Sequence, residues 1–306
     1  MPVHSPIILR QRLVYLNKSC RRIRKFEKGD KEMRIFGEDT IRLTHLRAIL
    51  LAMFIFIILF NQLQRFSIGF AFMGISMLIL PFLKEYDRYF IWMIVAFSLG
   101  DLAYLYCVKF TDFTSAGTAM KVVLNRLMLI CYAVPVFVIM KSFKQQMSLG
   151  FTSPDWNLPV VAPWTVFRLR TLKLKHFLIW AITLTIVCFV PLLKNNIGNL
   201  QGNFLLAGLS FAFVNAFLEE FLWRGLLLYG FKEVIGVRWA VAATSLGFGL
   251  SHITLGFTLP FSLLFAISGL LYAVLAIKTK SILPSLIWHF VISLLMAWGG
   301  IIFLGY

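Results

Sequence analysis

One apolar stretch, GLSFAFVNAFLEEFLWRGLLLYG, contains three ionisable residues, Glu219, Glu220 and Arg224. The stretch is long enough to cross a membrane. Each ionisable residue in such a stretch costs about 2.5–3.5 kcal/mol on insertion scales, so it indicates function by default. On a helix Glu220 and Arg224 are one turn apart, and the guanidinium can hold the Glu220 carboxylate. Glu219 is turned about 100° away and cannot use that arginine equally well. One carboxylate is therefore held ionised, and the other is free to accept and release a proton. A purely structural ion pair would need only one glutamate.

Two of the five histidines lie inside other apolar stretches. FGLSH puts Phe248 and His252 on one helical face, and HFVIS does the same for His289 and Ser293. A lone buried histidine is usually a packed core residue, whereas two near a glutamate pair indicate a shared site. The predicted depths from the inner face are about 15 Å for the glutamates, 20 Å for His252 and 9 Å for His289. We therefore predict a polar cavity between three helices, in the inner half of the bilayer.

Other polar residues in apolar stretches have weaker interpretations. Asn215 lies four residues before Glu219, on its face, and could position it. Asp101 and the Asn125–Arg126 pair are expected to form a structural interhelical hydrogen bond or ion pair in the accessory half. The four cysteines form no CxxC pair, which gives no indication of metal or redox chemistry.

The composition indicates the fold class. Of 306 residues, 59% are hydrophobic and 14% charged, against about 45–50% and about 25% in soluble proteins. We expect an all-α polytopic membrane protein with a polar catalytic cavity in its C-terminal half. A bilayer core about 30 Å thick needs roughly 20 apolar residues per helix. The sequence offers nine candidate spans, at 46–61, 66–83, 89–108, 122–140, 176–194, 203–230, 238–256, 258–277 and 283–304. The first two are short and could form one re-entrant pair, which would leave eight.

Basic residues predict the orientation. With the N-terminus inside, inner segments hold 24 Lys and Arg and outer connections hold four, so we expect a cytoplasmic N-terminus. The net charge of +17 fits contact with anionic headgroups rather than nucleic acid, because the basic residues flank apolar stretches. We divide the chain into four parts: a basic cytoplasmic arm at 1–45, an accessory transmembrane region at 46–140, a cytoplasmic interfacial segment at 141–175 and a catalytic membrane core at 176–304.

EEFLWRG, FGLSH and HFVIS resemble the motifs EExxxR, FxxxH and HxxxN of the CAAX-protease and bacteriocin-processing family (CPBP, or Abi) of intramembrane proteases. The resemblance covers roughly residues 145–304. It implies a glutamic-type endopeptidase in which Glu219 activates a water that His252 shares. It further implies that Glu220 with Arg224 supports the site and that His289 stabilises the oxyanion. Ser293 stands where the family has Asn, sometimes Asp, and a hydroxyl has a shorter reach than an amide.

Several alternatives stay open at this point. We expect no cofactor, but zinc held by Glu219, Glu220, His252 and His289 is an alternative to the metal-free mechanism. A non-catalytic scaffold, or an immunity or regulatory protein on a protease-derived fold, is the alternative to an enzyme, and Ser293 favours it. An ion-coupled transporter is disfavoured because the charges cluster on three C-terminal helices. The expected partner is a membrane-associated peptide or protein, and the expected location is a bacterial plasma membrane.

Overall fold

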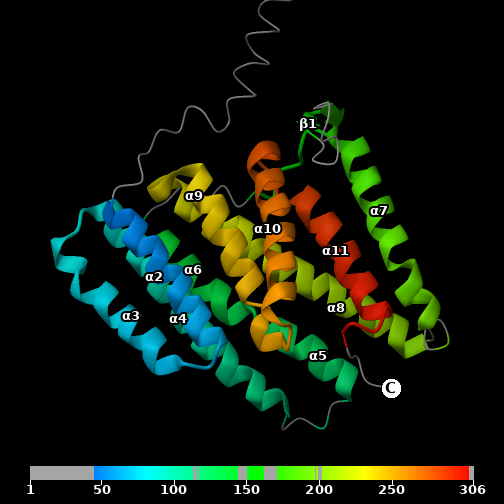
Figure 1. The fold of residues 1–306 in the computed structure, drawn as a ribbon, viewed down its shortest axis with the longest axis horizontal. Coiled ribbons are helices and arrows are strands. Elements are labelled where there is room, and N and C mark those ends of the chain that lie inside the picture. The colour runs from blue at the N-terminus through cyan, green and yellow to red at the C-terminus, as the bar shows by residue number, and fades with distance from the viewer. Residues whose placement is uncertain are drawn as a thin grey trace, which may run out of the picture. The chain divides into compact units, whose positions relative to one another are not determined.

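The computed structural model describes residues 45–112, 115, 117–143, 150–161, 171–196, 198 and 202–302. The basic arm predicted at 1–45 therefore lies outside the described residues, apart from His45. Helices dominate the described part, as the sequence predicted (Figure 1).

Of the helices of the first half, α2, α3, α4 and α6 gather on one side in Figure 1, whereas α5 lies at the lower edge, near α8. The apolar stretches of the first half are interrupted at Arg65, near Pro81, and at Met128 and Leu129, where one helix ends and the next begins. The bounds are α2 His45–Gln62, α3 Phe66–Leu78, η1 Leu80–Phe82, α4 Glu85–Asp112, α5 Thr118–Leu127 and α6 Ile130–Ser142.

The second half carries the predicted site. Its elements are α7 Leu174–Asn195, α8 Gly202–Glu220, the π-helical η3 Phe221–Leu228, α9 Tyr229–Leu250, η4 Ile253–Leu255, α10 Leu259–Thr279 and α11 Leu283–Trp298. Helix α8 packs against both α5 and α11, while α9 packs along α10. The α9–α10 approach requires Gly249, because a Cβ there would lie 2.5 Å from the Ser262 carbonyl oxygen. These contacts bring α8, α9 and α11 around one region.

The number of spans differs from the prediction. Within the described residues, six helical runs are long and apolar enough to cross a membrane, and two shorter apolar helices cover Phe66–Phe82 and Leu283–Trp298. The count of eight or nine is therefore not confirmed. One run, Gly202–Leu255, has 54 residues, but Gly236 breaks it with φ 78° and ψ 161°. A positive φ suits glycine, and this break lies in the connection predicted between 203–230 and 238–256.

The connection predicted as an interfacial segment contains two short strands. β1 Pro159–Val161 pairs antiparallel with β2 Thr171–Lys173, which the sequence interpretation did not foresee. The Gly150 carbonyl accepts a hydrogen bond from the Ile282 backbone N–H at 2.7 Å. This contact ties the segment to the turn between α10 and α11. The parts of the segment at 144–149 and 162–170 lie outside the described residues.

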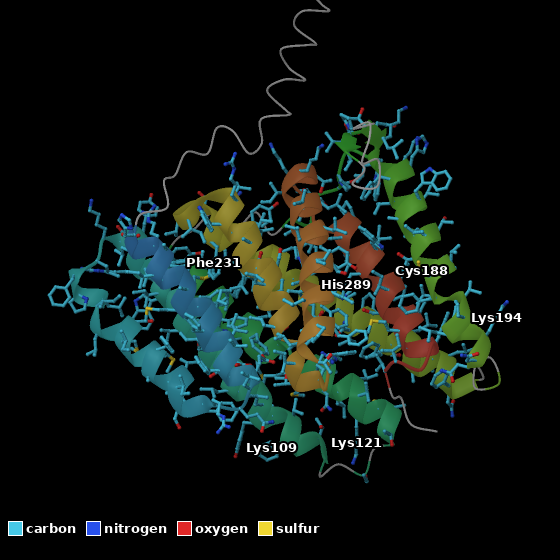
Figure 2. The ribbon with its side chains drawn as sticks, in the orientation of Figure 1. Lys109, Lys121, Cys188, Lys194, Phe231 and His289 are labelled. Carbon is cyan, nitrogen blue, oxygen red and sulfur yellow. The ribbon has the colours of Figure 1, made fainter. Side chains whose placement is uncertain are left out.

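One hydrophobic cluster joins the two halves of the described chain. Buried side chains of α2, α4 and α6 pack with those of η3, α9 and α10. Figure 2 shows Phe231 and His289 within the assembly, while Lys109 and Lys121 lie at its lower edge. The first half therefore packs directly against the helices that carry the predicted site.

Candidate functional site

Glu220 and Arg224 form the tightest ion pair of the site. Arg224 Nη1 lies 2.8 Å from Glu220 Oε1, and the two residues are 1% and 0% exposed. The pair spans the junction where α8 ends and the π-helical η3 begins, a geometry common at functional sites. The pairing predicted from the one-turn spacing is confirmed.

Arg224 has further partners that fix its orientation. Nη2 donates to the Gly269 carbonyl of α10 at 3.2 Å. The guanidinium carbon lies 4.4 Å from the Phe248 ring centroid and 5.2 Å from that of Tyr272. These contacts suit a planar, delocalised cation and would suit an ammonium poorly. Arg224 thus joins η3, α9 and α10 while it holds Glu220.

Glu219 has a looser environment. It is 4% exposed, and its Oε1 lies 3.7 Å from Nη1 of Arg126 on α5, beyond hydrogen-bond distance. Its Oε2 lies 3.5 Å from His289 Nε2 and has no hydrogen-bond partner among the described residues. Glu219 therefore faces a remote arginine, and its oxygens stay free of hydrogen bonds within the described chain.

His289 of α11 lies between the two glutamates. Its Nδ1 is 2.9 Å from Glu220 Oε1, and because that carboxylate is paired with Arg224, Nδ1 acts as the donor. The Tyr272 ring stacks on the imidazole, with centroids 5.2 Å apart and planes 21° apart. The ring is therefore oriented, and its Nε2 faces Glu219.

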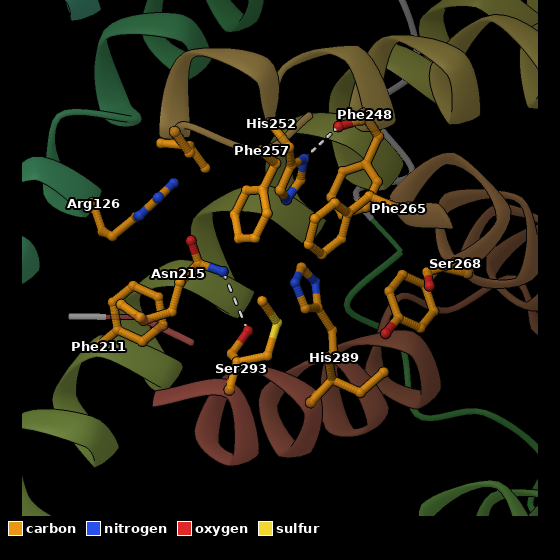
Figure 3. Close-up of a pocket in the computed structure, with 15 residues that line it drawn as sticks. Arg126, Phe211, Asn215, Phe248, His252, Phe257, Phe265, Ser268, His289 and Ser293 are labelled. Carbon is orange, nitrogen blue, oxygen red and sulfur yellow. Dashed lines mark hydrogen bonds between the residues drawn. The ribbon is translucent and has the colours of Figure 1, made fainter. Parts of the chain in front are cut away.

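His252 lies across the pocket from His289 (Figure 3). Its Nδ1 lies 2.7 Å from the Phe248 carbonyl oxygen. A carbonyl only accepts, so Nδ1 carries the hydrogen and Nε2 keeps a lone pair. The imidazole stacks on Phe265 with a centroid distance of 4.0 Å. Among the described residues, no hydrogen bond or ion pair joins His252 to Glu219, so His289 is the histidine in direct contact with that carboxylate.

Ser293 and Asn215 meet across α11 and α8. The Asn215 amide donates to Ser293 Oγ at 3.2 Å, and Asn215 Oδ1 is buried with no partner among the described residues. Among the described residues no hydrogen bond joins Asn215 to Glu219, which it could have positioned; its amide faces Ser293 instead. The hydroxyl accepts here, so its own proton is free to donate elsewhere.

Two cavities adjoin at this point. The larger is lined by His252, His289, Asn215 and Ser293 and by aromatic rings (Figure 3). The smaller is lined by Glu219 with Tyr104, Tyr132, Ser251 and neighbouring side chains. Arg126 and Leu255 line both. The predicted site residues therefore converge, but Glu219 faces the smaller cavity.

One segment of the chain is similar to a known protein family. Residues 201–295 match the family model described as type II CAAX prenyl endopeptidase, Rce1-like. The resemblance seen in the motifs is confirmed over this segment. No curated protein and no solved structure matches the chain. The matched Rce1-like segment contains all six predicted site residues and supports an intramembrane peptidase at the level of the family.

Arg126 lies outside the Rce1-like segment, and the sequence interpretation placed it elsewhere. Asp101 and the Asn125–Arg126 pair were expected to form an interhelical hydrogen bond or ion pair in the accessory half. Asp101 does form interhelical hydrogen bonds there, accepting from Gln62 of α2 and Tyr132 of α6, whereas Arg126 faces Glu219 at the site. Asn125 accepts from Thr111 on α4. The one available signal for Arg126 was an arginine inside an apolar stretch, which is costly without a partner carboxylate.

The donor atoms at the site do not suit the zinc alternative. Among the described residues, no three His, Cys, Asp or Glu side chains lie so that they could hold one metal ion. Glu220 Oε1 already accepts from Arg224 and His289, and an adjacent guanidinium repels a cation. The four proposed ligands therefore do not fit a metal in this arrangement, and no step below uses one.

Proposed function

We propose that the protein is an intramembrane endopeptidase that hydrolyses a peptide bond of a membrane-associated peptide or protein. The observation that carries the proposal is the unequal environment of two adjacent buried carboxylates. Glu220 is hydrogen-bonded to Arg224 and His289, whereas Glu219 keeps an oxygen without a hydrogen-bond partner among the described residues. Such a division gives one carboxylate a supporting role and leaves the other for proton transfer.

In the proposed reaction Glu219 is the general base. It takes a proton from a water molecule whose oxygen attacks the carbonyl carbon of the scissile bond. The carbon–nitrogen bond then breaks as the tetrahedral intermediate collapses, and the proton held by Glu219 passes to the leaving amine. The products are a carboxylic acid and an amine, which become a carboxylate and an ammonium once a proton passes from one to the other, and Glu219 returns to its starting form. His252 shares the water through its Nε2 lone pair.

The oxyanion of the intermediate is assigned to the α11 side of the larger cavity. His289 and Ser293 are one turn apart on α11 and both line that cavity. Ser293 accepts from Asn215, which leaves its own proton for a negatively charged oxygen. A strong oxyanion donor in a water-excluded site can be worth about 2.7–4 kcal/mol. We expect the Ser293 hydroxyl to contribute less, because its reach is shorter than that of the amide in the family motif.

The cavity wall indicates the kind of substrate. Beside the polar residues, the larger cavity is lined by apolar and aromatic side chains, namely Phe211, Phe248, Leu255, Phe257, Phe265, Ile292 and Met296. Such a wall suits large apolar side chains next to the scissile bond. We therefore propose an apolar segment of a membrane-associated peptide as the substrate.

The test is hydrolysis of an apolar membrane peptide by the full-length protein in lipid nanodiscs. Wild type should release two defined fragments and incorporate one oxygen from labelled water into the new carboxylate. Glu219→Gln should lower the rate by about 10²–10⁴-fold without loss of folded protein. Glu233→Gln is the matched control, because Glu233 is an exposed carboxylate paired with Lys232. Equal rates in wild type and Glu219→Gln would refute the proposal.

Chelation tests the metal-free mechanism. Extensive treatment with a membrane-permeant chelator should leave the hydrolysis rate unchanged, because no step needs a metal. Loss of activity that zinc restores, while magnesium does not, would overturn this part of the proposal and bring back the zinc alternative.

A non-catalytic scaffold is the second candidate, and one observation favours it. Arg126 lines both cavities, while Glu219 lines only the smaller one. A scaffold would bind the peptide in the larger cavity without cutting it. Crosslinking of intact peptide to wild type, with no fragments after many hours, would support the scaffold over the enzyme.

For the orientation, we propose that the turn at Gly236 faces the cytoplasm, as the distribution of basic residues predicts. Glu233 is exposed next to this turn, so Glu233→Cys offers a labelling position in a variant that otherwise lacks cysteine. A membrane-impermeant thiol reagent should label it only after the cells are opened. Efficient labelling in intact cells would reverse the proposed orientation.

A further inference from the structure

Arg126 is a buried cation on a helix that the sequence assigned to an accessory region. It lies in the last turn of α5, where the helix dipole favours a positive charge. It is only 8% exposed, and a buried guanidinium without a partner is strongly destabilising. Its partners therefore indicate why it is there.

The partners of Arg126 are few. Its Nη1 lies 3.7 Å from Glu219 Oε1, and its guanidinium carbon lies 5.8 Å from the Phe211 ring centroid. No side-chain hydrogen bond of Arg126 is found among the described residues. At 3.7 Å the guanidinium attracts the carboxylate without occupying its lone pairs. The charge of Glu219 is balanced, and its oxygens can still accept a proton.

The position of Arg126 adds a second, independent observation. Arg126 lines both the larger cavity and the smaller cavity of Glu219. In Figure 3 its side chain extends from α5 toward Asn215 and His252. Arg126 thus lies where the smaller cavity of Glu219 meets the proposed substrate pocket.

We infer that Arg126 is a positioning residue for Glu219, and this inference rests on the proposed function. Arg126 holds the Glu219 carboxylate at the boundary between the two cavities while leaving its oxygens free for the proton transfer. The active site then includes a residue of α5 in addition to the Rce1-like segment at 201–295. Because α5 packs against α8, a shift between these helices would change the placement of the base.

The kinetic test compares three variants of the full-length protein in nanodiscs. Arg126→Gln should lower kcat by about 10- to 100-fold with little change in KM, since a misplaced group of this kind costs up to about 10²-fold. Arg126→Lys keeps the charge and should recover kcat to within about 10-fold of wild type. Asn125→Ala is the matched control: it changes the residue next to Arg126 on α5, removes the contact of Asn125 with Thr111 of α4 and should keep the wild-type kcat.

Three kinetic outcomes would overturn the positioning role. The first is an Arg126→Gln variant with the wild-type kcat. The second is a decrease in kcat for Asn125→Ala as large as that for Arg126→Gln, which would mean that both substitutions act by weakening the packing of α5. The third is a loss confined to KM, which would mean that Arg126 binds the substrate instead.

A double-mutant cycle tests the pair without any activity. Thermal unfolding is measured for wild type, Arg126→Gln, Glu219→Gln and the double variant in the same nanodiscs. The Arg126→Gln shift should be several degrees in wild type and clearly smaller when Glu219 is already Gln. Additive shifts would overturn the pairing even if the protein is a protease. Coupling without any peptide hydrolysis by wild type would instead refute the proposed function and, with it, the positioning role.

Discussion

Two adjacent glutamates lie at the end of α8, and each faces a different arginine. One arginine follows on the same helical run, and the other lies on a separate helix. Glu220 pairs with Arg224 one turn away on the same run of helix, at 2.8 Å. Glu219 faces Arg126 of α5 at 3.7 Å. The difference shows how one helix can carry a rigid carboxylate and an available one side by side.

Charge alone does not separate the two pairs. Unit charges about 4 Å apart attract by about 4 kcal/mol at an effective dielectric constant near 20, so both pairs gain comparable Coulomb energy. Hydrogen bonds separate them, because Glu220 accepts from Arg224 and His289 while Arg224 also donates to Gly269. Glu219 has no corresponding network among the described residues. Geometry therefore assigns the supporting role to Glu220.

The largest predicted effect breaks the tight pair. Glu220→Gln leaves Arg224 buried without its counter-charge, so it should lower the free energy of unfolding by about 3–5 kcal/mol. Glu219→Gln should lower the free energy of unfolding clearly less, because the Glu219–Arg126 ion pair lacks a hydrogen bond. Thermal unfolding and the yield of folded protein in detergent measure both variants. Equal losses of stability would contradict the division of roles.

An intermediate effect is expected when lysine replaces each arginine. Arg224→Lys loses the planar contacts with Phe248 and Tyr272 and the hydrogen bond to Gly269. We expect it to cost about 1–3 kcal/mol of stability, since lysine is no substitute at a stacked site. Arg126→Lys should be milder, because that pair relies on charge alone. If Arg126→Lys lost more stability than Arg224→Lys in the same unfolding assay, Arg126 would be the more constrained of the two arginines.

The Glu220–Arg224 pair could be predicted from the sequence, whereas the Glu219–Arg126 pair could not. The spacing of Glu220 and Arg224 fixes their contact within one turn of helix. Nothing in the periodicity of 122–140 indicates that α5 packs on α8, so Arg126 was assigned to a separate polar group in the first half. Helix contacts of long sequence separation depend on the packing of the whole core, which one sequence leaves open.

The remaining fold follows the same division between local and remote features. Each of the nine apolar stretches consists mainly of helix within the described residues, because hydrophobic content is a local property. The strands β1 and β2 and the π-helical η3 escaped the sequence interpretation, since both depend on tertiary contacts. The convergence of Glu219 and His289 was foreseen from their order and depth, whereas the contact of Asn215 with Ser293 was not.

The smallest predicted effect concerns the α11 side of the cavity, where Ser293 replaces the asparagine of the family motif. Its proton is free to donate because Asn215 supplies the hydrogen bond that Ser293 Oγ accepts. Ser293→Ala should therefore lower kcat by about tenfold with little change in KM, as a bond made mainly in the transition state would. Asn215→Ala should lower kcat less, because it removes only the group that orients the hydroxyl.

Ser293→Asn sharpens the same prediction. An asparagine at 293 would offer its own amide to the cavity, so kcat should be kept or raised if Asn215 can turn aside. The competing interpretation is that Ser293 merely packs and bonds back to the His289 carbonyl, a bond not found among the described residues. That interpretation predicts a silent Ser293→Ala and a disruptive Ser293→Asn. Both variants are measured on one cleavable peptide. If Ser293→Ala kept the wild-type kcat and Ser293→Asn were inactive, the oxyanion role of Ser293 would be refuted. The division between a supporting and a catalytic residue would then rest on the two glutamates of α8 alone.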